Sequence, residues 1–296
     1  MTNSSPTRGL IALLRLPYWL MTGGLSLLTA FAILKDPLSM SAQTAILIFF
    51  SMAFITSAGF AINDYFDRES DKVIKPNRPI PSGALSLRQV VAVSGLLFAL
   101  GLVMAFLINW LSFLIIAIDS FLLLAYSYMV KRKSGFVANV LVGILTGTAF
   151  LYGEATISAP PTLSLISLCL YPIAFGTIGG NVLRDILSVE GDAKVGYPTL
   201  PQKIGNYNAA KVGAVFFMLT GLFAPLPALP LFSNHFSVYY LPLILLWSVL
   251  LIYSSVRLLT LGSTVLGIRK YERIVTMSMI LLPLALIVEA VVGGLM

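Results

Sequence analysis

The sequence predicts an all-α polytopic membrane protein with nine transmembrane helices around a central cavity. The first observation is composition, because 58% of the 296 residues are hydrophobic and only 10% are charged, unlike soluble domains. The second is a series of nine apolar runs that each reach the ~20 residues needed to cross a bilayer. The third is charge placement: all but one of the 19 Lys and Arg residues lie in or beside segments that this count places in the cytoplasm.

The predicted spans follow one another without a linker or low-complexity segment, so residues 1–296 form a single domain. In order, they cover residues 10–34, 42–66, 87–107, 110–130, 136–156, 162–187, 209–232, 237–260 and 272–295. With the N-terminus in the cytoplasm, only Lys35 falls outside, and the net charge of +7 reflects topology, not a nucleic-acid surface. We therefore expect an integral protein of the cell membrane that contacts lipids and binds no nucleic acid.

Two polar strings interrupt the apolar helices. They consist of Asn63, Asp64, Asp67 and Asp71 after the second span, and of Asn181, Asp185, Ser188 and Asp192 at the end of the sixth. Read as helix, each string forms one polar stripe, within an arc of roughly 100° for the first and about 60° for the second. Both stripes lie at predicted cytoplasmic helix ends, in loops expected at about 67–86 and 188–208, so they can face one another across one cavity.

The residue types in these strings indicate a magnesium site. Carboxylates this close together repel one another unless cations lie between them, and hard oxygen ligands suit Mg²⁺ better than zinc or copper. The chain has one cysteine, Cys169, and one histidine, His235, which excludes a disulfide framework and Cys or His metal sites. We interpret Cys169 as a packing residue and His235 as a solvated residue of an outer loop. Mg²⁺ in turn usually implies a phosphate ligand.

Asp119 and Glu289 are acidic residues of the predicted spans that lie away from the strings. Asp119 is near the middle of the fourth span, where it either contacts the acceptor or another polar group of the cavity, or is a protonated, hydrogen-bonded structural acid. Glu289 is near the outer end of the ninth span and is expected at the membrane interface. The shared spacing of the two strings suggests two related halves with the ninth helix as an addition, although two such short patterns also arise by chance.

At the level of motifs, residues 63–71 (NDYFDRESD) and 75–83 (KPNRPIPSG) resemble the first signature of the UbiA superfamily of intramembrane prenyltransferases. The second signature is matched by Arg184 and Asp185, residues 188–192 (SVEGD), Gly196 and residues 199–201 (TLP). The end of the fourth span, at Tyr126, Ser127, Lys131 and Arg132, also fits. One position departs from the commoner pattern, since Ser188 stands where an aspartate is usual. The chlorophyll synthase branch has the same serine, whereas the first signature is similar to both that branch and the archaeal digeranylgeranylglyceryl phosphate synthases.

The resemblance implies that the strings bind the diphosphate of an isoprenoid donor through Mg²⁺. The expected metal ligands are Asn63, Asp64, Asp67, Asp71, Asp185 and Asp192, and the acids expected to matter most for catalysis are Asp67, Asp71, Asp185 and Asp192. Contacts to the diphosphate are expected from Asn63, Lys75, Arg78, Lys131, Arg132 and Arg184, although cytoplasmic Lys and Arg also serve only to anchor topology. Cations held there stabilise the charge that builds up on the leaving group as the allylic carbon–oxygen bond breaks.

We therefore expect a Mg²⁺-dependent prenyltransferase that moves a geranylgeranyl-type chain from an allylic diphosphate to a lipophilic acceptor, with its active site toward the cytoplasm. Geranylgeranylglyceryl phosphate, a precursor of membrane ether lipids, ranks first among acceptors, ahead of chlorophyllide and a quinone-precursor ring. A UbiA-type terpene cyclase would use the same metal site but let the carbocation close on its own tail. A cation-binding transporter is the alternative from another class, but transporters more often place charges deep in broken helices.

Overall fold

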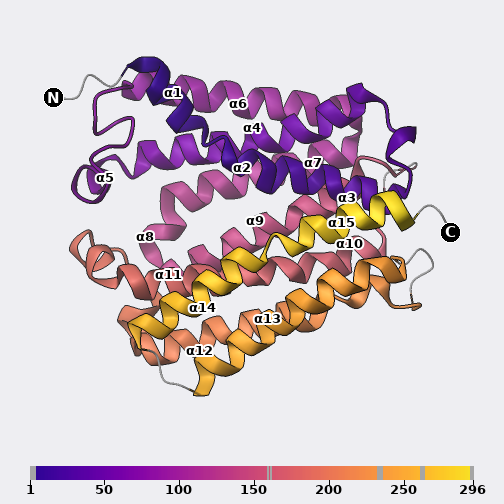
Figure 1. The fold of residues 1–296 in the computed structure, drawn as a ribbon. Helices are drawn as coiled ribbons and strands as arrows, with labels where there is room; N and C mark the ends of the chain where they lie inside the picture. Colours follow the sequence, from indigo (N-terminus) through magenta and orange to yellow (C-terminus); the bar gives the residue numbers. More distant parts are fainter. Residues whose placement is uncertain (1–4, 159, 161, 232–235, 261–263, 294–296) are drawn as a thin grey trace.

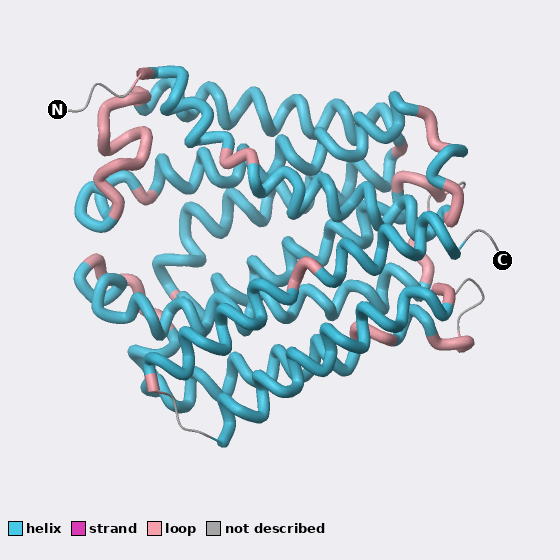
Figure 2. Tube along the Cα trace, viewed as in Figure 1, coloured by secondary structure: helices cyan, strands magenta, loops and turns pink. Residues whose placement is uncertain are grey.

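The structure is a computed structural model that describes residues 5–158, 160, 162–231, 236–260 and 264–293. Within these ranges it contains helices, turns and loops and no strand (Figure 2). Nine helical segments of the described chain are long and apolar enough to cross a membrane, so the predicted all-α membrane fold and the number of spans are confirmed. His235 lies outside the described residues, and its place in an outer loop stays a prediction.

The helices of the first four spans are interrupted by short π- and 3₁₀-helical turns, labelled η. They are α1 (Pro6–Leu14), α2 (Pro17–Trp19), η1 (Leu20–Gly24), α3 (Leu25–Leu34), η2 (Pro37–Ser39), α4 (Ala42–Phe66), α5 (Arg68–Ile74), α6 (Leu87–Ile108), α7 (Trp110–Ala125), η3 (Tyr126–Val130) and α8 (Lys131–Lys133). The remaining elements are α9 (Gly135–Ala155), α10 (Leu165–Leu170), η4 (Tyr171–Ala174), α11 (Phe175–Lys194), α12 (Leu200–Phe223), η5 (Leu226–Ala228), η6 (Val238–Tyr240), α13 (Leu241–Thr260), α14 (Val265–Ser278) and α15 (Leu281–Val292).

The loops that carry the polar strings are shorter than expected. The predicted loop at 188–208 is reduced to residues 195–199, because α11 continues to Lys194 and α12 begins at Leu200 instead of near residue 209. Thr199 and Pro201 mark this start, since proline in the first turn removes a backbone N–H that would lack a helical partner. The predicted loop at 67–86 contains the extra helix α5. Both strings are therefore held on helical backbone for most of their length.

Successive spans run in opposite directions, so α5, α8 and the junction of α11 with α12 lie at the same end of the bundle, on the left in Figure 1. We call this the α5 end. Among neighbours in sequence, α4 packs on α6, and α12 packs on both α11 and α13. Helix α3 packs on both α9 and α15 and so joins the first spans to the last.

Buried side chains form separate hydrophobic clusters on the two sides of this junction. One cluster lies mainly among α10 to α15 and includes Leu183, Phe217 and Leu251, while another lies among α4, α6, α7 and α9 and includes Ile55 and Ile116. Large apolar side chains remain exposed along the spans. Because a lipid-facing surface does not need polar cover, this exposure agrees with an integral multi-pass membrane protein.

Candidate active site

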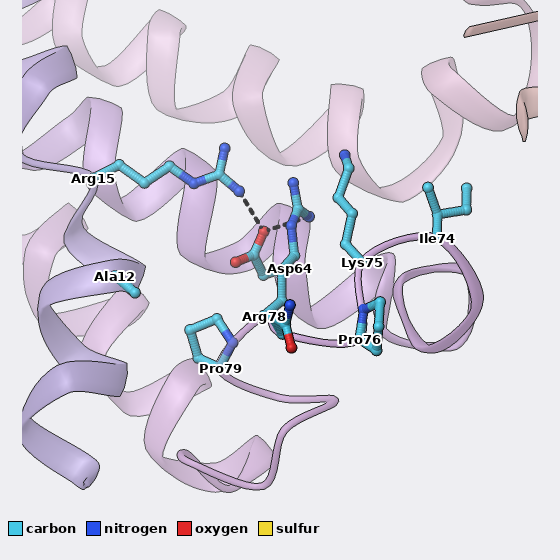
Figure 3. Close-up of a pocket in the computed structure, with 9 residues that line it drawn as sticks. Ala12, Arg15, Asp64, Ile74, Lys75, Pro76, Arg78 and Pro79 are labelled. Atoms are coloured by element: carbon cyan, nitrogen blue, oxygen red, sulfur yellow. Dashed lines mark hydrogen bonds and ion pairs between the residues drawn. The ribbon is translucent and has the colours of Figure 1, made fainter. Parts of the chain in front are cut away.

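Asp64 and Asp71 of the first string lie at the α5 end and are held by two arginines. Oδ1 of Asp64 accepts hydrogen bonds from Nη2 of Arg15 at 2.7 Å and from Nη1 of Arg78 at 2.9 Å (Figure 3). The same Nη1 of Arg78 donates to Oδ2 of Asp71 at 2.6 Å. Both carboxylates are buried, with 3% and 4% of Asp64 and Asp71 exposed. Buried carboxylates need such partners because an unpaired buried charge is costly.

Asp67 lies on the same stripe and is contacted from three separate parts of the chain. Its Oδ2 accepts from Nζ of Lys131 at 2.5 Å and from Nδ2 of Asn63 at 2.9 Å. Its Oδ1 accepts from the hydroxyl of Tyr197 at 2.8 Å, and that hydroxyl also lies 2.9 Å from Oγ of Ser70. The side-chain Oδ1 of Asn63 is buried beside this carboxylate and has no hydrogen-bond partner among the described residues. An oxygen with unused lone pairs therefore adjoins Asp67.

Two local irregularities bring Lys131 and Tyr197 to this point. Lys131 directly follows the π-helical turn η3, whose wider turn changes the direction of the side chains after it. Tyr197 lies in the five-residue loop between α11 and α12, after Gly196, whose φ of 73° suits glycine. The Lys131 ammonium lies 4.7 Å from the centre of the Tyr197 ring. Burial, more than the charge of Asp67, raises the pKa of Tyr197, so its hydroxyl stays protonated and can donate.

The second string lies across from the first, on α11. Oδ2 of Asp185 accepts from Nδ2 of Asn139 on α9 at 2.7 Å, and Oδ2 of Asp192 lies 2.6 Å from the hydroxyl of Ser188. Within the described residues, no hydrogen bond or ion pair joins an acid of one string directly to an acid of the other. Lys131 binds Asp67 of the first string, and Tyr197, which follows the second string, binds the other oxygen of the same carboxylate.

Comparison with known proteins decides the family. Residues 23–286, most of the chain, match the UbiA prenyltransferase family. The chain belongs to the UbiA prenyltransferase family. It is therefore a prenyltransferase, as its two signatures predict.

Individual relatives agree with this membership. The chain is 38% identical over 224 residues to digeranylgeranylglyceryl phosphate synthase of Natronomonas pharaonis, which covers 75% of this chain and 78% of the relative. A solved structure concerned with digeranylgeranylglyceryl phosphate synthase in membranes is similar with a TM-score of 0.78 at 27% identity, covering 97% of this chain and 99% of that one. A UbiA homologue from Archaeoglobus fulgidus, solved with GPP and Mg²⁺, shares the fold with a TM-score of 0.65 at 22% identity, over 94% of this chain and 99% of that chain.

The donor set of this UbiA enzyme fits Mg²⁺. Among the described residues, no three Asp, Glu, His or Cys side chains converge as a complete metal cluster. Mg²⁺ does not need one, because it usually takes one or two carboxylates and completes its shell with phosphate and water. The Oδ1 of Asn63 is buried beside Asp67 and has no partner among the described residues. It is a hard oxygen that can coordinate Mg²⁺ or accept a hydrogen bond from a magnesium-bound water. The ligands expected from the sequence are thus distributed over two stripes and not gathered at one point.

The basic residues expected at the diphosphate divide into two groups. Lys131, Arg78 and Lys75 lie among the acids of the first string. Arg132 instead donates from Nη2 to the backbone oxygen of Phe66 at 2.9 Å, and Arg184 pairs from Nε with Oε1 of Glu272 on α14 at 3.0 Å. Their predicted contacts with diphosphate stay predictions, and in this structure both guanidiniums are engaged elsewhere.

A cavity of about 460 Å³ opens beside Asp64, between α1 and the segment that follows α5 (Figure 3). Its lining is Ala12, Arg15, Asp64, Ile74, Lys75, Pro76, Asn77, Arg78 and Pro79. The side chains of the described residues offer the Lys75 ammonium no hydrogen bond or ion pair, although its backbone is hydrogen-bonded to Asp71 and Arg78. Burial lowers the pKa of Lys75, and the nearby charges of Arg78, Lys131 and Arg15 lower it further, while Asp71 raises it. The cavity therefore concentrates positive charge.

Three residues of the site escaped the sequence analysis. Arg15 reaches Asp64 from α1, Asn139 reaches Asp185 from α9, and Tyr197 reaches Asp67 from the loop before α12. Arg15 carried a usable signal, because an arginine within an apolar run is a functional candidate by default. Asn139 and Tyr197 carried none, since neither belongs to a charged pattern and both contacts depend on long-range packing.

Asp119 and Glu289, which lie away from the two strings, are both buried. Oδ2 of Asp119 accepts from the Thr148 hydroxyl at 2.7 Å, while its Oδ1 is buried without a partner, so both readings of Asp119 stay open. Glu289, expected at the interface, is instead fully buried within the protein. Its carboxylate accepts from the backbone N–H of Ser237 at 2.9 Å and lies 3.8 Å from Nζ of Lys35. These partners supply the polar contacts that water at an interface would otherwise provide.

Proposed function

We propose that this enzyme transfers a geranylgeranyl-type chain from an allylic diphosphate to geranylgeranylglyceryl phosphate, with Mg²⁺ at the α5 end. The observation that carries the proposal is that Asp67 of the first string is bound by Lys131, at the end of the fourth span, and by Tyr197, in the loop that follows the second string. The choice of acceptor is supported by the relatives named digeranylgeranylglyceryl phosphate synthase. Mg²⁺ is supported by the A. fulgidus homologue solved with GPP and Mg²⁺.

In this proposal Asn63, Asp67 and Asp71 hold metal on one stripe, and Asp185 and Asp192 on the other. Bound Mg²⁺ would neutralise the diphosphate and stabilise its charge as a leaving group. Lys131, already held by Asp67, donates to diphosphate oxygens as a point charge. Tyr197 keeps Asp67 in place and, with the loop that carries it, limits the access of water.

The bond changes follow from the two substrates. The allylic carbon–oxygen bond of the donor breaks, and its electron pair leaves with the diphosphate. The oxygen of the free acceptor hydroxyl forms an ether bond to the allylic carbon, and the hydroxyl proton passes to water or to a carboxylate of the site. The membrane end at which this happens is proposed to be cytoplasmic, because Lys and Arg are concentrated at the α5 end while Lys35 lies near the opposite end.

Replacement of the two central acids tests the proposal. Asp67→Asn and Asp71→Asn should each lower transfer of labelled geranylgeranyl groups by on the order of 10² or more, because each removes a charged metal ligand. Glu69→Gln is a matched control, since Glu69 lies on the same segment but is exposed and pairs with Lys72. Product analysis by mass spectrometry, with and without geranylgeranylglyceryl phosphate, identifies the reaction. Normal turnover by either Asn variant at saturating Mg²⁺ refutes the metal assignment, and cyclised product without acceptor indicates a terpene cyclase.

A further inference from the structure

The cavity beside Asp64 has a lining suited to an anion. Arg15, Lys75 and Arg78 contribute three positive charges to its wall and Asp64 one negative charge. Asp71 pairs with Arg78 from outside the lining, so one positive charge remains in excess. A phosphate monoester carries about two negative charges at neutral pH, and a cavity with an excess of positive charge attracts such a group.

The two guanidiniums also have hydrogen-bond donors to spare. Each uses a single nitrogen on carboxylates: Nη2 of Arg15 on Asp64, and Nη1 of Arg78 on Asp64 and Asp71. Within the described chain, no hydrogen bond occupies Nε or Nη1 of Arg15, or Nε or Nη2 of Arg78. Asp64 thus fixes the direction of two planar donor groups whose remaining N–H groups suit a phosphate.

Without a bound anion, Arg15 is held in an unfavourable backbone conformation and Lys75 in an unfavourable electrostatic environment. Arg15 has a left-handed backbone with φ of 50°, which non-glycine residues rarely adopt, and its guanidinium lies 4.3 Å from the centre of the Phe60 ring. Lys75 is exposed on the cavity wall, and partial desolvation together with the nearby charges of Arg78, Lys131 and Arg15 lowers its pKa. A bound phosphate would relieve this repulsion and satisfy the ammonium.

The cavity is placed where a lipid headgroup can reach it. Its wall includes Ala12 and Arg15 of the first span, and large apolar side chains of the same span, among them Ile11 and Leu20, are exposed on the surface that faces lipid. Asp67, Lys131 and Tyr197, by contrast, are not part of the lining. The cavity therefore lies beside the site at Asp67 but has a different wall.

We propose that this cavity binds the phosphate monoester of the lipid acceptor through Arg15, Lys75 and Arg78, while the donor diphosphate lies between the two strings. The proposal rests on the proposed function and gives Lys75 and Arg78 to the acceptor instead of the diphosphate. Asp64 is then a positioning residue for the two arginines. The enzyme then distinguishes acceptors by their phosphate group. A neutral acceptor of the same shape would leave the positive charges of the cavity wall without an anionic partner.

The test compares two acceptors that differ only in charge: geranylgeranylglyceryl phosphate and the same lipid with a hydroxyl in place of the phosphate. Arg15→Gln and Lys75→Gln should lower kcat/KM for the phosphate acceptor by about 10-fold or more, the loss of one charge-assisted hydrogen bond. Neither variant should change kcat/KM for the uncharged acceptor or KM for geranylgeranyl diphosphate. Arg15→Lys should recover part of the preference, and Arg8→Gln, an exposed residue of the same helix, is the matched control.

The alternative outcomes are distinct. A higher KM for the donor with an unchanged acceptor preference would assign these residues to the diphosphate and overturn the proposal. An equal loss with both acceptors would indicate a structural role, or a cavity for a bilayer phospholipid, and would overturn it as well. Wild-type enzyme that uses only acceptors without phosphate would overturn the proposed function together with this site. Wild-type enzyme that uses the phosphate acceptor, with Arg15→Gln keeping the wild-type preference, would overturn this site alone.

Discussion

At the scale of single residues, Asp67 is the point where distant parts of the chain meet. Its two oxygens accept hydrogen bonds from Asn63 one turn earlier, from Lys131 after the fourth span, and from Tyr197 before the seventh. The tyrosine is the contact that ties the second string to the first. It therefore sets both the orientation of this carboxylate and the position of the loop at 195–199.

Replacement of Tyr197 by phenylalanine isolates the hydroxyl. The ring that lies under Lys131 is retained, but the hydrogen bond to the charged Asp67 is lost, and such bonds contribute about 1.5–3 kcal/mol. We expect kcat/KM for the donor diphosphate to fall by about 10-fold, measured with labelled donor at fixed acceptor. Tyr207→Phe is the control, because Tyr207 is exposed and stacks only with Lys211. Wild-type kinetics for Tyr197→Phe would show that the hydroxyl has no part in positioning Asp67.

The unusual serine of the second string gives another residue-scale prediction. Because Ser188 donates to Asp192 at 2.6 Å while Asp185 is held separately by Asn139, the two aspartates can bind metal without a carboxylate at position 188. Ser188→Ala should therefore be mild. Asp185→Asn and Asp192→Asn should each raise the Mg²⁺ concentration for half-maximal activity, since a charged ligand is lost. Parallel Mg²⁺ titrations decide the matter, and an inactive Ser188→Ala beside a normal Asp185→Asn would reverse the assignment.

Which site residues can be predicted from sequence depends on how far their partners lie along the chain. The acids of each string repeat at helical spacing, so local geometry alone places them on one stripe. Arg15 and Tyr197 contact acids that are 49 and 130 residues away, and only the packing of the spans brings them there. Arg184 shows the reverse case: it directly precedes Asp185 in sequence, yet its side chain points to Glu272 on α14.

At the scale of elements, the first span depends on close packing at a π-helical turn. Gly23 in η1 lies against the backbone of α4, where a Cβ would come within 2.3 Å of the carbonyl oxygen of Phe49. Its neighbour Gly24 has room, with the nearest side-chain atoms at 3.9 Å. The two adjacent glycines therefore have different reasons to be small, and only one of them sets the distance between the first and second spans.

Alanine substitutions distinguish the two glycines. Gly23→Ala should destabilise the protein by about 1–3 kcal/mol, because α4 and the first span must move apart. Gly24→Ala should be neutral or stabilise by up to about 1 kcal/mol, because alanine favours helix. Thermal unfolding midpoints of both variants in the same detergent measure this. Equal midpoints would show that the contact with Phe49 adjusts without cost.

Element boundaries were predicted best where hydropathy alone determines them. The second span was expected at 42–66 and is Ala42–Phe66, because an apolar run ends there at a charged string. The start of α12 was placed nine residues late, since its first turns are polar and project beyond the apolar run. Helix α5 was absent from the prediction because its seven residues, five of them polar, give too short and too weak a pattern.

At the scale of the whole molecule, alternation of the spans puts both strings and most cations at one end. Lys72 in α5 and Leu38 in η2 lie near opposite ends of the bundle, and both side chains are exposed. From the distribution of Lys and Arg we expect the end that carries Lys72 to face the cytoplasm. The two positions thus report on the orientation of the entire protein.

Cysteine labelling tests this orientation. In a Cys169→Ala background, Lys72→Cys should react with a membrane-impermeant maleimide only from the cytoplasmic side, and Leu38→Cys only from the opposite side. Sealed vesicles of known orientation provide the measurement, and permeabilised vesicles control for reactivity. Reaction of both cysteines from one side would contradict the arrangement of nine spans.

The ion pairs of the first string determine the charge state of the site before the donor binds. Asp64, Asp67 and Asp71 are already neutralised by Arg15, Lys131 and Arg78. The protein thus carries its own counter-ions for these three acids. In the proposed function, Asp67 would hold Mg²⁺ that accompanies the donor, and Lys131, freed from that carboxylate, would donate to the diphosphate. Arg15 and Arg78 would stay on Asp64 and continue to face the acceptor. Mg²⁺ would then bind together with each diphosphate instead of remaining as a permanent part of the protein.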